Sequence, residues 1–158
     1  MKLKGKVALI TGGGMGIDTA VAERFVAEGA KICITGRRQE MLDKVVQKLT
    51  PGRVATCSGD VTKVEEVKRM VDATLAFGGR LDVVVNNAGI DPGGTVTDLD
   101  PEVWRKVIET NLTGLFLVMK ASIPHLIKGG EARSSMFLRW ADYAAFRGCL
   151  HIARQKPA

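Results

Sequence analysis

Two short apolar runs in this chain are each followed at once by a glycine-bearing turn. Val7–Ile10 precedes the turn Thr11–Gly16, and Leu81–Val85 precedes the turn Asn86–Gly89. In an open parallel sheet, the turns that follow neighbouring strands meet at one edge and form a crevice for a dinucleotide. The two turns together therefore predict an α/β fold with a nucleotide site at the carboxyl edge of its sheet.

Segments typical of strands and helices alternate along the chain, which predicts a parallel sheet with helices on both faces. The expected strands are Lys6–Thr11, Lys31–Thr35, Arg53–Cys57 and Leu81–Asn86, and the expected helices are Met15–Glu28, Gln39–Leu49, Val61–Phe77 and a long segment that follows Asp100. Asp100 should cap that last helix, with Pro101 in its first turn. Two helical segments should meet near Asn111–Gly114. The predicted fold is a Rossmann-like, doubly wound, three-layer α/β/α domain over residues 1–130, truncated, with strand order 3-2-1-4 and strand four as an exposed edge.

Composition favours one globular domain in a chain of 158 residues. No apolar run approaches the roughly 18 residues of a membrane span, and we expect neither a membrane partner nor a signal peptide. Cys33, Cys57 and Cys149 lack metal-ligand spacing. Cys33 and Cys57 lie in predicted strands and are expected to be buried free thiols, which suits a reducing cytoplasm. Half of the net charge of +6 comes from the last 28 residues. Their arginines are too widely spaced to predict a nucleic-acid arm, so no nucleic-acid partner is expected.

The first glycine-bearing turn stands between a strand and a helix, where glycines let a pyrophosphate approach the backbone and the helix N-terminus offers unpaired N–H groups. A plain strand-to-helix turn is the alternative. Asn86–Gly89 could likewise be a turn whose asparagines cap backbone groups. Asp60, after the third strand, could accept a hydrogen bond from an adenine amino group or cap the next helix.

The end of the second strand bears on the choice of cofactor. Arg37 and Arg38 follow Gly36 there, where a carboxylate would repel a 2′-phosphate and arginine would bind it. We therefore predict that Arg37 binds the cofactor and that NADP is preferred over NAD. A solvated basic pair at a helix start is the alternative.

Taken in order, the glycine loop, Asp60-Val61, the Asn86–Gly89 turn and the segment Glu109–Gly114 resemble the short-chain dehydrogenase/reductase family over residues 1 to about 130. The resemblance implies a Rossmann domain that transfers hydride between a nicotinamide cofactor and a carbonyl or alcohol substrate. It also implies that the cofactor is bound by Gly12, Gly14, Met15, Gly16, Ile17, Asp60, Val61, Asn87, Ala88 and Gly89. Asn111 matches the family's catalytic asparagine. Its alternative is a polar residue that distorts the helix and has no chemical role.

Two departures from the family pattern bear on function. Asp18 replaces the last glycine of the first loop, which adds bulk and places a negative charge where a pyrophosphate would bind. After residue 130 the family has a strand that ends in a serine, followed by Tyr-x-x-x-Lys. Here residues 131–158 show no buried-strand pattern, and Tyr143 is followed by Arg147, which cannot replace a lysine that tunes a tyrosine pKa. We expect the tail to be irregular or a short helix.

An out-of-frame tail would explain the second departure. Joining the third base of each codon from Glu131 onward to the first two bases of the next permits the string SSIINVSSLGGLRCLPGMPAYCASKAG, with the tyrosine codon across His151 and Ile152. We therefore predict an NADP-dependent oxidoreductase by family that is inactive in this chain, or alternatively a non-catalytic dinucleotide-binding remnant. Self-association through the exposed edge or the long helix is also expected, because unpaired edges and apolar faces associate.

Overall fold

The computed structural model describes residues 1–13, 17–93, 97–129 and 133–136, and places five strands, five α-helices and one π-helix there. The strands are β1 (Val7–Thr11), β2 (Lys31–Gly36), β3 (Val54–Ser58), β4 (Val83–Asn86) and β5 (Arg133–Met136). The helices are α1 (Ile17–Ala27), α2 (Gln39–Val46), α3 (Val64–Gly78), α4 (Pro101–Ile108), the π-helix η1 (Glu109–Thr113) and α5 (Gly114–Lys128).

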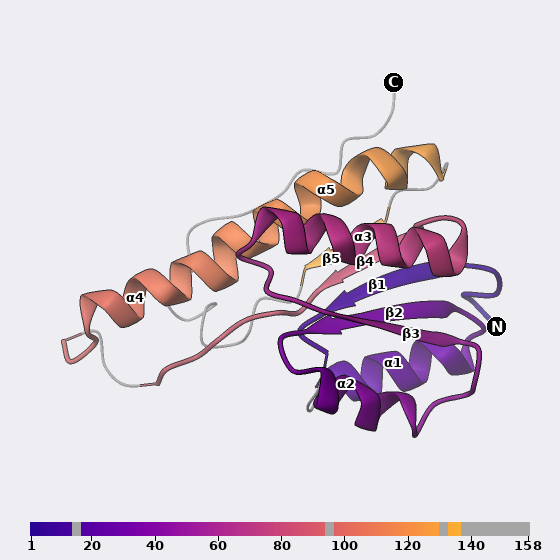
Figure 1. Cartoon of the computed structure of the whole chain (residues 1–158), viewed down its shortest axis with the longest axis horizontal. Helices are drawn as coiled ribbons and strands as arrows, with labels where there is room; N and C mark the ends of the chain where they lie inside the picture. The colour runs from indigo at the N-terminus through magenta and orange to yellow at the C-terminus, as the bar shows by residue number, and fades with distance from the viewer. Residues whose placement is uncertain (14–16, 94–96, 130–132, 137–158) are drawn as a thin grey trace.

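The strands form one parallel sheet in the order β3-β2-β1-β4-β5. Figure 1 shows α1 and α2 on one face of this sheet and α3 and α5 on the other, while α4 extends the line of α5 beyond the sheet. The predicted three-layer α/β/α arrangement and the strand order 3-2-1-4 are therefore confirmed.

The expectation that β4 would be an exposed edge was wrong. Four residues of the tail form β5, which pairs with β4 in parallel from Val83↔Arg133 to Asn86↔Met136. Backbone N–H and C=O groups along a strand can form hydrogen bonds with a neighbouring segment whatever side chains that segment carries. A segment without the apolar pattern of a buried strand can therefore pair there. The rest of the tail, residues 137–158, lies outside the described residues.

Each face of the sheet has its own apolar core. Successive side chains of a strand point to opposite faces, so Ile10 packs with Leu42 of α2 on one face, while Leu9 packs with Val71 of α3 and Val118 of α5 on the other. All five residues of β1 are buried. Central strands of a parallel sheet are covered on both faces, which explains the unbroken apolar run that marked β1 in the sequence.

Local signals set the ends of the helices that border the site. The Asp100 carboxylate accepts a hydrogen bond from the backbone N–H of Glu102 at 2.6 Å, with Pro101 as the first helical residue, as predicted. The α3 helix ends at Gly78 and is followed by the capping residue Gly79, which has a φ of 77°. Among the described residues, no helix is both long enough and apolar enough to cross a membrane.

A buried carboxylate fastens the amino end of the sheet, opposite the glycine-bearing turns. Asp82 is 2% exposed and accepts hydrogen bonds from the backbone N–H of Val7 at 2.9 Å and from Arg80 Nε at 2.8 Å. Lys6 Nζ lies 3.4 Å from the same carboxylate. The Arg80 guanidinium also donates to the carbonyl oxygen of Gly129 at 3.1 Å, so this cluster joins β1, β4 and the end of α5.

Candidate functional site

The turns after β1 and β4 touch each other at the carboxyl edge of the sheet. The Thr11 hydroxyl oxygen accepts hydrogen bonds from the backbone N–H groups of Asn87 and Ala88, each at 3.2 Å. Gly12 has a φ of 82°, and a Cβ there would lie only 2.7 Å from the Ala88 Cα. The two turns thus open on the same edge, and glycine at position 12 is required both by its φ and by this close approach.

The ends of β2 and β3 adjoin the same edge. The backbone N–H of Gly13 donates to the carbonyl oxygen of Thr35 at 2.7 Å, and the N–H of Gly59 donates to that of Gly36 at 2.9 Å. A Cβ on Gly36 would lie 2.7 Å from the Gly13 carbonyl oxygen. Four turns, one from each of β1 to β4, therefore form a continuous rim of backbone along which an extended ligand could lie.

Asp60 and Val61 begin the segment between β3 and α3. One Asp60 carboxylate oxygen accepts the backbone N–H of Thr62 at 2.9 Å. Because α3 begins at Val64 with Lys63 as its N-cap residue, Asp60 closes a turn ahead of the helix and does not cap the helix itself. Val61 is buried, and a Cβ on Gly114 would lie 2.6 Å from its Cγ2, so this segment packs against the start of α5.

These elements converge at a shallow depression beside the rim. It is lined by Thr11, Val61, Asn86, Ala88, Gly114, Leu115 and Val118. Side chains from β1, β4 and α5 thus meet beside the rim, together with Val61.

Asn111 lies in the π-helix that joins α4 to α5, which confirms the interruption predicted near this residue. Its side-chain oxygen accepts the backbone N–H of Ile90 at 2.8 Å, and its side-chain nitrogen donates to the Ile90 carbonyl oxygen at 3.0 Å. The carboxamide therefore links the segment that follows the Asn86–Gly89 turn to the long helix, which is the continuous helical segment formed by α4, η1 and α5. A catalytic role for Asn111 remains a prediction.

Two polar groups along the rim have no partner among the described residues and suit a phosphorylated nucleotide. Arg37 is exposed directly after β2, and no described residue pairs with its guanidinium. The second carboxylate oxygen of Asp60 is similarly unpaired within the described residues. A cation and an acceptor on adjacent turns fit a 2′-phosphate and an adenine amino group, respectively.

The structure describes the two ends of the predicted glycine-bearing loop. Gly14, Met15 and Gly16 lie outside the described residues, and Ile17 is the first residue of α1, with its side chain not described. The same holds for the side chain of Asp18, so its predicted effect on pyrophosphate binding remains a prediction.

The sequence reasoning missed two residues that organise the site. Thr11 links the two turns through its hydroxyl, yet its partner Asn87 is 76 residues away, and no local pattern signals such a contact. Asn86 is 4% exposed and donates to the sulfur of Met119 at 3.1 Å, while its side-chain oxygen has no partner among the described residues. Its place at the end of an apolar run was the only available signal.

One ionisable group in the described part of the chain, the Cys33 thiol, is buried within β2. Burial raises the pKa of the Cys33 thiol to about 11, which makes it a poor nucleophile at neutral pH. Within the described part of the chain, no group of three or more His, Cys, Asp or Glu residues is placed to hold a metal ion.

The sheet order and the helices on both faces define a doubly wound domain of the open α/β class. Residues 6–134 match the short chain dehydrogenase family, and the chain belongs to that family. It is 37% identical over 128 residues to an uncharacterized oxidoreductase of Staphylococcus epidermidis, a match that covers 80% of this chain and 55% of that protein.

Another relative and a solved structure agree with this assignment. The NADP-dependent (R)-specific alcohol dehydrogenase of Lentilactobacillus kefiri is 37% identical over 134 residues, which cover 84% of this chain and 53% of that protein. A crystal structure of a short chain dehydrogenase from Bacillus anthracis superposes with a TM-score of 0.79 at 31% identity, covering 85% of this chain and 57% of the other. The chain thus spans about half the length of the relatives it matches.

Proposed function

We propose that this chain binds an NADP-type dinucleotide along the rim formed by the turns after β1 to β4. The observation that carries the proposal is the contact between Gly12 and Ala88, which brings the two diagnostic turns to one edge of the sheet. Gly12, Asn87, Ala88 and Gly89 would border the pyrophosphate, ribose and nicotinamide portions. Asp60 and Val61 would border the adenine.

A preference for NADP over NAD rests on Arg37. Its guanidinium is exposed after β2 and has no partner in the described part of the chain. Arginine binds a phosphate through two parallel hydrogen bonds, whereas a carboxylate here would favour the unphosphorylated ribose. The Lentilactobacillus kefiri relative is named as NADP-dependent, which is in keeping with this preference.

When bound, such a cofactor supplies hydride to a carbonyl or accepts it from an alcohol. Reduction of a carbonyl also needs a proton on its oxygen, and oxidation of an alcohol releases one. In the family, a tyrosine beside a lysine donates or accepts this proton. Tyr143 is followed by Arg147 in this sequence, and Arg147 remains protonated. We therefore propose that this chain binds the cofactor but does not turn over a substrate.

The experiment that tests this function has two readings. Titration with NADPH, followed by the fluorescence of the nicotinamide, should give saturable binding, with weaker binding of NADH. The same protein mixed with NADPH and small ketones or aldehydes should show no oxidation above background. No binding of either cofactor would refute the first statement. Substrate-dependent oxidation that disappears in Asn111→Ala would refute the second.

A second copy of the chain is the proposed partner of the long helix. Exposed large apolar side chains gather on α4, η1 and α5, namely Trp104, Leu112, Phe116, Ile123 and Ile127, with exposures between 41% and 67%. Patches of this kind mark interaction sites. These five side chains form an apolar stripe. In a dimer with a two-fold axis, the stripe of one copy can pack against the same stripe of the other copy. The predicted association through the edge of β4 lacks an open strand, because β5 pairs with β4.

We propose that the protein resides in a reducing cytoplasm. Cys33 is buried and free, and the partly buried Cys57 is also free. Free thiols of this kind are compatible with a reducing cytoplasm.

A further inference from the structure

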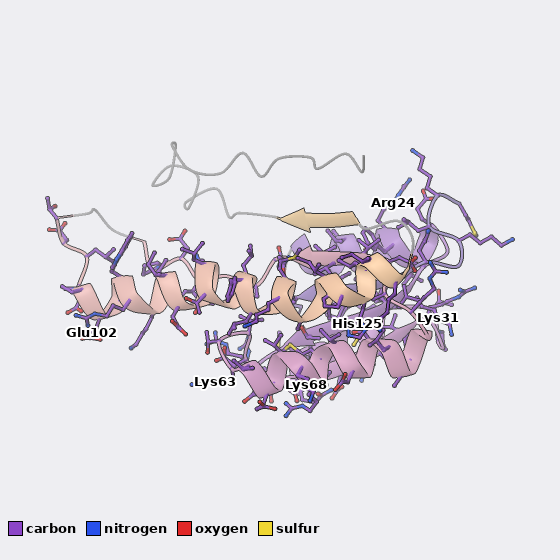
Figure 2. All side chains as sticks on the ribbon, turned by 90° about the horizontal axis from the view of Figure 1, so that it is seen from above. Arg24, Lys31, Lys63, Lys68, Glu102 and His125 are labelled. Atoms are coloured by element: carbon purple, nitrogen blue, oxygen red, sulfur yellow. The ribbon has the colours of Figure 1, made fainter. Side chains whose placement is uncertain are left out.

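Two side chains of α3 hold the turn that carries Asp60. Glu66 Oε2 accepts a hydrogen bond from the backbone N–H of Asp60 at 2.7 Å. Arg69 Nη2 donates to the carbonyl oxygen of Ser58, also at 2.7 Å. The helix therefore binds a donor and an acceptor on either side of Gly59. Figure 2 shows the start of α3, marked by Lys63 and Lys68, alongside the long helix.

Gly59 is the residue that lets these side chains approach. A Cβ at this position would lie 2.7 Å from Cε of Met70, 3.1 Å from Oε2 of Glu66 and 3.4 Å from Nη2 of Arg69. The backbone N–H of Gly59 meanwhile donates to Gly36 at the end of β2. The turn is thus held from the helix on one side and from the sheet on the other, and a side chain at position 59 would have to displace the Met70 methyl group.

These contacts fix the backbone of Asp60 and leave part of its carboxylate available. Its N–H is bound by Glu66, and one carboxylate oxygen accepts the N–H of Thr62 at 2.9 Å. The other oxygen has no partner among the described residues. An ionised carboxylate only accepts hydrogen bonds, so it matches a purine with a 6-amino group and disfavours one with a 6-oxo group.

A surface ion pair would not account for this arrangement. Glu66 and Arg69 are 3.9 Å apart, and their side chains are 36% and 58% exposed, a geometry that contributes little by itself. The shortest hydrogen bonds of both side chains are instead those with backbone atoms of the turn. Charged groups bonded to a backbone make stronger hydrogen bonds than neutral pairs do.

We propose that Glu66 and Arg69 are positioning residues for adenine recognition, because they hold Asp60 with its free carboxylate oxygen ready to accept the 6-amino group. This inference rests on the proposed dinucleotide function. Without the two side chains, the turn would have to be ordered when the nucleotide binds, and the entropy lost at that step lowers affinity.

Backbone exchange tests the clamp directly. In Glu66→Ala, hydrogen–deuterium exchange at the amide of Asp60, followed by NMR, should be at least about tenfold faster than in the wild type, since a charged hydrogen bond is lost. Glu65→Ala is the matched control, because it removes the same charge from the same helical turn and Glu65 has no partner among the described residues. Exchange at Asp60 should be unchanged in that control.

Nucleotide affinity tests the positioning role. Glu66→Ala should bind NADPH about tenfold more weakly than the wild type. Glu65→Ala should bind it equally well, and Glu66→Gln, which keeps an oxygen acceptor, should recover part of the loss. The loss should be much smaller for the 6-oxo analogue of NADPH, which lacks the amino group. In an Asp60→Ala background, Glu66→Ala should have no further effect, because Glu66 acts through Asp60.

The outcomes separate this inference from the function on which it rests. If the wild type binds no NADPH, the proposed function and the positioning role both fail. If the wild type binds NADPH and Glu66→Ala matches Glu65→Ala in affinity or in exchange, only the positioning role fails. Equal losses for NADPH and its 6-oxo analogue would also overturn it.

Discussion

Asn111 and Ile90 make two hydrogen bonds, at 2.8 and 3.0 Å, between one carboxamide and one residue's backbone. The bonds join the π-helix to the segment that follows the Asn86–Gly89 turn. Because each group satisfies the other, neither is left unpaired at this partly buried contact.

Asn111→Ala should lower the free energy of unfolding by about 1–3 kcal/mol, since two hydrogen bonds are lost and the Ile90 backbone groups lose their partners. Glu109→Ala, an exposed substitution in the same π-helix, should change it by less than about 0.5 kcal/mol. Urea denaturation followed by circular dichroism measures both. Equal effects of the two variants would show that the carboxamide is not a structural link.

Asp82→Ala should cost about 2–3 kcal/mol of stability, because the carboxylate accepts hydrogen bonds from Arg80 and from the backbone of Val7. The matched control is Asp72→Ala, an exposed acid on α3. Thermal and urea unfolding should both show the difference. Since Asp82 lies at the amino end of the sheet, NADPH affinity should not change, and a parallel loss of affinity would contradict the placement of the site.

The same carboxylate should make stability depend on acid pH. Burial acts to raise the pKa of Asp82, but hydrogen bonds from Arg80 and Val7 and the nearby positive charges hold that pKa below its ordinary value. A lowered pKa in the folded chain contributes stability above the unfolded pKa of about 3.9, and this is lost as the pH falls toward the folded value. Asp82→Asn should therefore flatten the stability profile below about pH 4. An unchanged profile would exclude Asp82 as a source of acid sensitivity.

Arg37→Ala should weaken NADPH binding by about 10- to 100-fold and leave NADH binding nearly unchanged, because only NADPH has the 2′-phosphate. Lys44→Ala, which removes a positive charge from α2, is the control for a general charge effect. Competition by 2′,5′-ADP should follow the NADPH result. Equal losses for both cofactors would place Arg37 away from the 2′ position.

Phe116→Glu should reduce self-association through the long helix. Phe116 is 56% exposed, so the substitution should leave the fold intact while it places a charge within the apolar stripe. Sedimentation velocity should show a shift from dimer to monomer in the variant, whereas Glu109→Ala should behave as the wild type. A wild type that stays monomeric at high concentration would contradict the proposed association.

Local patterns in the sequence predicted much of the fold. The apolar run of Val7–Ile10, the Asp100 cap and the break near Asn111 are each encoded within a few residues, and the structure confirms all three. The order of the first four strands was predicted from the Rossmann-like pattern of the two glycine-bearing turns. Right-handed crossovers alone allow other orders.

The remaining features depend on contacts distant in sequence or on backbone alone. The pairing of β5 uses main-chain groups, so its side chains carried no signal. The Thr11 bridge spans 76 residues. Glu66 looked like an ordinary acidic residue near the start of a helix, because its acceptance of the Asp60 N–H depends on how the preceding turn folds back.

Gly12 and Ala88 meet at the edge of the sheet where we propose that the dinucleotide binds, and the affinities of two glycine variants test this placement. Gly12 and Gly52 both have positive φ values, 82° and 76°, but a Cβ would meet Ala88 only at Gly12 and nothing within 4 Å at Gly52. NADPH titrations should therefore show wild-type affinity in Gly52→Ala and no saturable binding in Gly12→Ala. Undiminished binding by Gly12→Ala, or none by the wild type, would contradict the account.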